Sequence, residues 1–138
     1  MDRSRVESFV ADHMGPMMTF LGLGDWSIAT SMERLDGDNA AVCRRAGEYR
    51  LATITFDADK FNNFDWLLDT MFHELAHCLL WPLDMYRNIA TAGFDEDSVA
   101  GKQDRQAFHH AVEMMVSNLD LVWDRHLRDA YLERRTRP

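Results

Sequence analysis

The sequence predicts an α+β fold in a single domain, residues 1–138, with an amino-terminal helix, a small antiparallel sheet of about three strands and two later helices. Three observations predict it. Apolar residues recur at helical spacing near the start, alternate from about residue 26 to 56, and return to helical spacing after residue 64. A chain of 138 residues can build one hydrophobic core but not two, and its hydrophobic fraction of 46% is that of a folded protein.

The first segment, residues 3–22, places Val6, Val10 and Met17 at helical spacing, and Gly15-Pro16 interrupts it. We expect one kinked helix, or a helix followed by a turn. Strand-like alternation follows in WSIATSMERL, and a turn signal lies at DGDN, residues 36–39. The segment AAVCRRAGEYRLATITFD, residues 40–57, reads as more strand, with a second turn or bulge at Ala46-Gly47 and clear alternation over residues 51–56. These segments predict the three antiparallel strands.

The two later helices are expected over residues 65–80 and 103–134. The first ends before Pro82, because the residue that precedes a proline avoids the helical region. The connection over residues 83–102 has a short helical possibility at residues 85–90 and otherwise reads as an irregular loop.

Polar residues form one narrow line along the otherwise apolar helix of residues 65–80. The line consists of Asp69, Thr70, His73, Glu74, His77 and Cys78. Because buried polar groups are costly unless they are satisfied, this line requires a metal, other side chains or a water-filled cleft. Asp69 is a candidate hydrogen-bond partner that would orient His73 without binding the metal itself.

His73 and His77 lie one helical turn apart, so both imidazoles can reach one zinc ion. Glu74 lies about 100° around the helix from His73, too far aside to be a ligand but close to a zinc-bound water. Zinc lowers the pKa of such a water towards about 7, and Glu74 can accept its proton as the water attacks a carbonyl. The HELAH stretch therefore predicts zinc as the cofactor and Glu74 as the general base.

The charge distribution argues against a nucleic-acid partner. Residues 57–104 contain ten acidic and three basic side chains, which is nearly the whole of the net charge of −8. Phosphate binding would need the opposite charge. We expect a peptide or protein substrate, with an acidic cleft that favours basic or neutral peptides.

The beginning of the chain carries charges where a signal peptide would be apolar, and no apolar run reaches the length of a membrane span. These features predict a cytoplasmic protein that does not enter a membrane. Its two cysteines, Cys43 and Cys78, are then expected to be free thiols.

The order of the predicted elements resembles that of the zincin metallopeptidases. A helix comes first, followed by a small sheet ending in ATITFD, the HELAHCLLW stretch and a second long helix. The resemblance is greatest to the compact gluzincins, called minigluzincins, and to small metallopeptidases of bacteriophage and bacterial genomes. It implies that His73 and His77 bind zinc, that Glu74 is the catalytic base, and that the last strand, Ala52–Phe56, lines the cleft and holds an extended substrate by strand addition.

The third zinc ligand must come from further along the chain. The metzincin extension HExxHxxGxxH would need glycine at position 80 and histidine at position 83, where the sequence has Leu80 and Leu83. Glu113, on the expected long helix beside its apolar face, is the preferred candidate and resembles the glutamate of gluzincins. The alternatives are Glu96, within an acidic stretch, and His109, one turn before Glu113.

If Glu113 is the ligand, His109 or His110 could orient it or stabilise an oxyanion, and Tyr86 and Arg87 are further oxyanion candidates. The leading hypothesis is a zinc metallopeptidase. The alternatives are a non-catalytic zincin-like metal-binding module acting through protein–protein contacts, and a metal-free helical interaction protein. Glu74 favours the first, because a scaffold needs the two histidines but no base between them. The sequence gives neither the substrate nor the oligomeric state.

Overall fold

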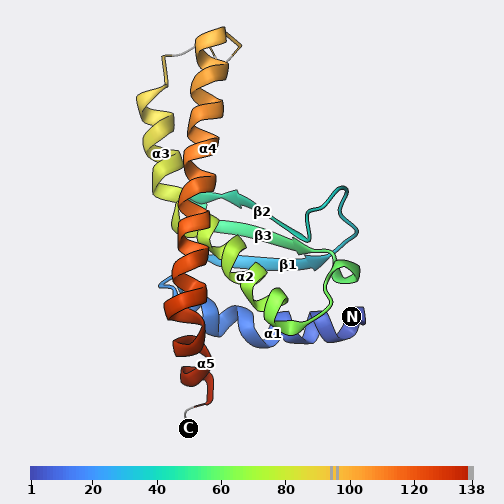
Figure 1. Ribbon diagram of the computed structural model, residues 1–138. Helices are drawn as coiled ribbons and strands as arrows, with labels where there is room; N and C mark the ends of the chain where they lie inside the picture. The colour runs from blue at the N-terminus through green and yellow to red at the C-terminus, as the bar shows by residue number, and fades with distance from the viewer. Residues whose placement is uncertain (94, 96, 137–138) are drawn as a thin grey trace.

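The computed structural model describes residues 1–93, 95 and 97–136, and it is an α+β arrangement (Figure 1). The helices are α1 (Arg3–Phe20), α2 (Phe64–Leu79), α3 (Trp81–Ala90), α4 (Val99–Val122) and α5 (Arg128–Thr136), and the strands are β1 (Ser27–Met32), β2 (Ala41–Ala46) and β3 (Leu51–Phe56). Short 3-10 turns occupy Gly47–Tyr49 and Ala58–Lys60, and a π-helical turn, Trp123–Leu127, joins α4 to α5.

The three strands form a mixed sheet, and the prediction of an antiparallel sheet is therefore wrong for one strand pair. The strand order is β1-β3-β2, with β2 antiparallel to β3 but β1 parallel to β3. A hairpin of four residues, 47–50, keeps β2 and β3 adjacent and antiparallel, and Arg50 takes the left-handed conformation there, with φ of 52°. The longer connection over residues 33–40 spans the sheet, so that β3 lies between β1 and β2.

This order also corrects the expected role of Ala52–Phe56. As β3 it is the central strand, hydrogen-bonded on both sides, so it has no free edge for a substrate strand. The edge strand that contacts α2 is β2.

The helices agree with the sequence expectations except in the connection. α1 is one helix that contains Pro16, and α2 matches the helix expected over residues 65–80. Residues 99–136 are helical throughout, and α3 is longer than the short helix expected there. Of the segment 83–102, predicted to be mostly an irregular loop, residues 83–90 belong to α3 and residues 99–102 to α4.

The core lies between the sheet, α1, α2 and the α4–α5 column. Its largest fully buried side chains come from all of these elements: Met17, Ile54, Phe56, Leu67, Met71, Phe72, Leu75, Trp123 and Tyr131. α4 and α5 run as one column past α2 and the end of the sheet, and α3 lies beside the first half of α4, away from the sheet (Figure 1). α3 has no buried residue, so the α3–α4 pair projects from the body of the molecule.

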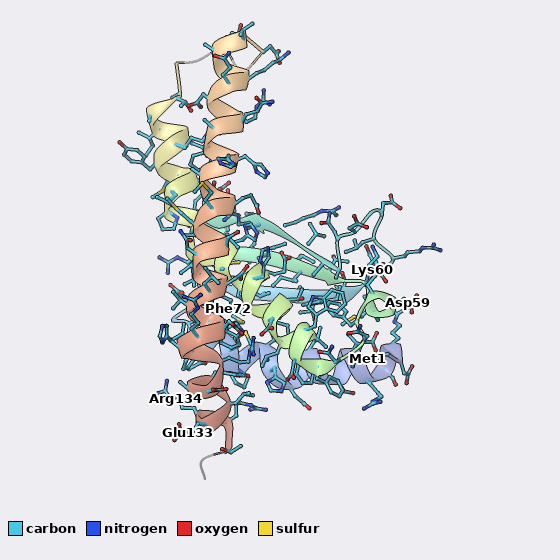
Figure 2. All side chains as sticks on the ribbon, in the orientation of Figure 1. Met1, Asp59, Lys60, Phe72, Glu133 and Arg134 are labelled. Atoms are coloured by element: carbon cyan, nitrogen blue, oxygen red, sulfur yellow. The ribbon has the colours of Figure 1, made fainter. Side chains whose placement is uncertain are left out.

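Lys60 fixes the loop between β1 and β2. Its ammonium group donates hydrogen bonds to the carbonyl oxygens of Leu35 (2.7 Å), Gly37 (2.7 Å) and Asn39 (2.9 Å). The buried Asp57 carboxylate accepts a bond from the Leu35 N–H at 2.9 Å. Figure 2 shows Lys60 and Met1 at the same end of the molecule. This loop is held firmly where it forms one rim of the cleft described below.

Candidate metal centre and adjoining cleft

α2 carries the HELAH residues in its second half, and a side-chain cap fixes its start. Asn63 starts the helix by accepting a hydrogen bond from the Trp66 N–H at 2.8 Å. His73 and His77 are half-buried on the side that meets α4, whereas Glu74 and Cys78 are buried on the side that meets β2. One turn of α2 thus presents two imidazoles and one carboxylate at the junction of β2 and α4.

His73 is oriented by a residue that the sequence did not single out. Its Nδ1 donates a hydrogen bond to the Asp120 carboxylate on α4, at 2.8 Å. The rings of His73 and His77 are 5.3 Å apart between centroids and inclined by 73°. Because Asp120 holds the proton on Nδ1, the lone pair of His73 lies on Nε2, the nitrogen that could bind a metal.

Asp120 lies seven residues after Glu113, two helical turns along the same face of α4. That spacing is the signal by which the sequence could have indicated it.

Asp69, the expected partner of His73, lies in a different network. Its carboxylate accepts hydrogen bonds from the Trp123 indole at 2.8 Å and from the Arg128 guanidinium, at 2.8 Å to each oxygen. Arg128 also pairs with Asp124. Asp69 lies one turn before His73 on α2, but its carboxylate bonds to Trp123 and Arg128 and not to His73. Asp69 therefore fastens α2 to the start of α5.

Glu74 is 6% exposed, and burial raises the pKa of its carboxyl group. The carboxylates of Glu113 and Asp120 raise this pKa further, while His73 and a hydrogen bond from the Cys43 backbone N–H oppose them. Burial also lowers the pKa of His77, so the neutral imidazole is favoured, which is the form that binds metals. The site therefore combines a carboxyl group that is costly to ionise with one imidazole, that of His77, whose neutral form is favoured.

Glu113 is half-buried on α4 and lies close enough to alter the pKa values of both Glu74 and His77. It affects each of them more than Asp120 does. Of the alternative third ligands, His109 is exposed, and Glu96 lies outside the described residues.

The remaining oxyanion candidates lie on α3 and α4. His110 is exposed, and Tyr86 is 72% exposed on α3. The Arg87 guanidinium lies over the Phe108 ring and pairs with Asp104 at 3.4 Å. None of the three lines the cleft beside Glu74.

Within residues 1–93, 95 and 97–136, no three histidine, cysteine, aspartate or glutamate side chains are arranged to hold a metal ion. The donor set nevertheless fits zinc in its chemistry. Two imidazoles and one carboxylate are a usual catalytic set for this ion, and the carboxylate that orients His73 is the usual support for such a ligand. Three carboxylates near one another, two of which raise the pKa of the third, would be stabilised by a cation.

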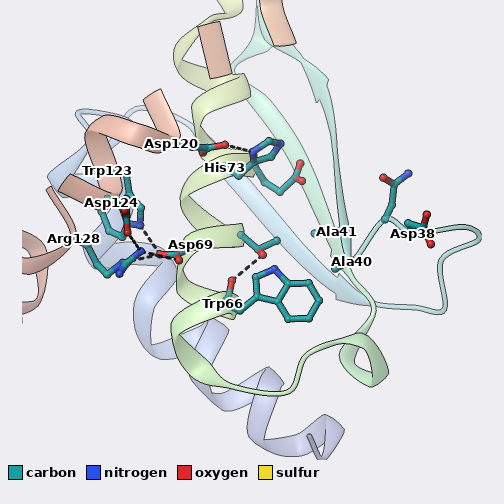
Figure 3. A pocket seen from close by; sticks show the side chains of 13 residues that line it. Asp38, Ala40, Ala41, Trp66, Asp69, His73, Asp120, Trp123, Asp124 and Arg128 are labelled. Atoms are coloured by element: carbon teal, nitrogen blue, oxygen red, sulfur yellow. Dashed lines mark hydrogen bonds and ion pairs between the residues drawn. The ribbon is translucent and has the colours of Figure 1, made fainter. Parts of the chain in front are cut away.

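A cleft of about 410 Å³ adjoins this group (Figure 3). Figure 3 shows α2 along its floor, residues 38–41 on one side, and Asp120, Trp123, Asp124 and Arg128 on the other. His73 and Glu74 line this cleft, whereas His77 and Glu113 do not. Its lining contains five carboxylates, of which two are paired with the one arginine.

β2 is fastened to α2 beside the site. Arg45 donates to the His77 carbonyl oxygen and pairs with Asp84 at the start of α3. The Cys43 and Cys78 sulfur atoms are 3.8 Å apart, in hydrogen-bond contact. This contact raises the pKa of Cys43 and lowers that of Cys78. Both thiols are free, as expected, but no sequence pattern indicated that they would meet.

Comparison of the chain with protein-family models, with curated proteins and with solved structures gives no significant match. None of the described helices has the length and apolar character needed to cross a membrane.

Proposed function

We propose that this protein is a zinc-dependent metallopeptidase with a zincin-like fold. In this proposal His73, His77 and Glu113 bind zinc, and Glu74 is the general base. The observation that carries it is the hydrogen bond of 2.8 Å between His73 Nδ1 and Asp120. A structural histidine can bond through either nitrogen. A ligand is typically fixed through one nitrogen by a carboxylate from a second element, which leaves the other nitrogen for the metal.

Zinc, when bound, would supply a Lewis acid that polarises the substrate carbonyl and lowers the pKa of a water molecule. Glu74 would accept a proton from that water and pass it to the leaving amine. Two properties of its carboxyl group support this role. It lines the cleft, and burial raises its pKa, which makes the carboxylate a stronger proton acceptor.

The cleft and the edge strand support a peptide substrate. β2 is an edge strand beside α2, so an extended peptide could pair with it next to Glu74. The carboxylates in the lining favour peptides with lysine or arginine near the cleaved bond.

The first test is metal content. We expect one zinc ion per chain, lost when His73 or His77 is replaced by alanine and bound more weakly in Glu113→Ala. Cys43 and Cys78 could bind zinc as a thiol pair, so the matched control is a double variant with alanine at both cysteines. That control should keep its zinc. Full occupancy in the histidine variants, or loss of zinc in the cysteine control, would contradict the ligand assignment.

The second test is cleavage of a library of fluorescence-quenched peptides. We expect Glu74→Gln to keep its zinc and lose cleavage, because glutamine has nearly the same shape but cannot accept the proton. Zinc binding without cleavage of any peptide by the wild-type chain would instead favour the non-catalytic metal-binding module.

A further inference from the structure

A pair of thiols lies at the contact between the edge strand β2 and helix α2. Cys43 is half-buried on β2, and Cys78 is 1% exposed on α2. Their sulfur atoms are 3.8 Å apart, and neither belongs to a disulfide. Buried cysteines usually pack as small apolar side chains, but here the two sulfurs touch each other directly.

Contacts on both sides hold this pair in register. The Cys43 backbone N–H donates to Glu74, one turn before Cys78 on α2. Two residues further along β2, Arg45 donates to the His77 carbonyl oxygen. These contacts fix the strand against the helix, so the thiols remain neighbours during ordinary side-chain motion.

The distance is close to that needed for a covalent bond. A disulfide joins its sulfurs at about 2.05 Å, so the two sulfurs must approach each other by about 1.75 Å from 3.8 Å. Rotation of the two cysteine side chains, with a small local adjustment of β2 against α2, can supply this approach.

We propose that Cys43 and Cys78 form a redox-active dithiol site that a peroxide oxidises to a reversible disulfide. Hydrogen peroxide oxidises the more exposed thiol, Cys43, to a sulfenic acid and releases one water. The Cys78 sulfur then attacks the Cys43 sulfur, and the hydroxyl group leaves with the thiol proton as a second water. Two thiols and one peroxide thus give one disulfide and two waters, and the peroxide takes up the two electrons. A small dithiol reverses the step by thiol–disulfide exchange.

This site does not depend on zinc or on peptide cleavage. Oxidation would link β2 to α2 covalently through Cys43 and Cys78, and Cys78 directly follows His77. The link restricts the unfolded chain, so the melting temperature of the oxidised form should be higher than that of the reduced form.

The test uses the full chain as purified, reduced with dithiothreitol, desalted and then treated with hydrogen peroxide. We expect the mass to fall by two hydrogen atoms and the denatured chain to show no free thiol. Peptide mapping should link residue 43 to residue 78, and dithiothreitol should restore both thiols.

Cys43→Ala and Cys78→Ala are the matched variants, and neither should lose two hydrogen atoms. With oxidised glutathione, Cys43 in Cys78→Ala should form the mixed disulfide faster than Cys78 in Cys43→Ala, because Cys43 is the more exposed. The proposal fails if wild-type thiols both survive the oxidant, if each is oxidised separately, or if the disulfide joins two chains. Because these readouts need no zinc, they can succeed even where the metallopeptidase proposal fails.

Discussion

Asp120→Ala tests whether the carboxylate of α4 supports a metal ligand or only packs the helices. The substitution removes the acceptor that lies 2.8 Å from His73 Nδ1 and leaves the imidazole free to rotate and to change tautomer. If His73 binds zinc, the affinity for zinc must fall. If His73 is only a structural residue, zinc content does not depend on Asp120.

The size of the effect follows from the exposure of the pair. Loss of such a supporting group typically lowers metal affinity by about 10- to 100-fold. The side chains of His73 and Asp120 are 34% and 37% exposed, so water screens the interaction and the lower end applies. We therefore expect about a tenfold loss in Asp120→Ala, which is about 1.4 kcal/mol. Asp120→Asn keeps a neutral acceptor about half as strong, so its loss should be about threefold.

The assay is competition for zinc between the protein and a chromophoric chelator, with alanine at Cys43 and Cys78 in every variant so that the thiols cannot bind the ion. Asp124→Asn is the control, because it removes a carboxylate from the same cleft, where it pairs with Arg128 and not with His73. The assignment is refuted if the Asp120 variants bind zinc as tightly as the chain that keeps Asp120. It is also refuted if Asp124→Asn loses as much zinc affinity as the Asp120 variants.

Three further predictions concern stability. Gly47→Ala should lower the free energy of unfolding by about 1–3 kcal/mol in urea titrations, because a Cβ there would lie 2.1 Å from Trp81 Cδ2. Asn63→Ala should lower it by about 1 kcal/mol, since the first turn of α2 loses its cap. Asp57→Asn should be less stable than the wild type at neutral pH. The hydrogen bond from the Leu35 N–H lowers the Asp57 pKa, so its stabilising effect is complete above pH 3.8, the ordinary value, and is lost as the pH falls through the lower folded value.

Each of these has a matched control. Gly24→Ala should change little, because nothing lies within 4 Å of the added Cβ. Asn62→Ala and Asp59→Asn alter exposed neighbours of the cap and of the buried carboxylate. The packing argument fails if Gly47→Ala is as stable as the wild type. The capping argument fails if Asn62→Ala and Asn63→Ala lower the stability equally. The argument for Asp57 fails if the stability difference between the wild type and Asp57→Asn persists unchanged far below pH 3.8.

The helices and the position of the HELAH residues were predictable because their signals are local. Helical spacing over residues 65–80 indicates α2, and four-residue spacing alone places His73 and His77 on one side of it. The proline at position 82 marks the boundary between α2 and α3. β1 and β3 were also predictable from the alternation of their own residues, whereas the β2 segment was predicted only as further strand beside a turn signal.

The pairing of the strands was not predictable in the same way. A turn signal at residues 36–39 shows that the chain bends, but it does not show whether the strands it joins are neighbours. Here they are separated by β3, which makes the sheet mixed and makes β2 the edge that meets α2. Alternation identifies a strand and its faces, whereas strand order depends on which edges pair when the whole domain packs.

The sequence by itself determined the chemistry that is available: two histidines and a glutamate on one turn of a buried helix, and a glutamate on a later helix beside its apolar face. Only the tertiary structure decided which groups meet. It joins His73 to Asp120 rather than to Asp69, and it brings together the Cys43 and Cys78 sulfurs. The physical reason is that these contacts depend on the position and orientation in which α4 and β2 pack against α2. That register is set by the packing of the whole core, whereas spacing along the chain fixes only the face on which each residue lies.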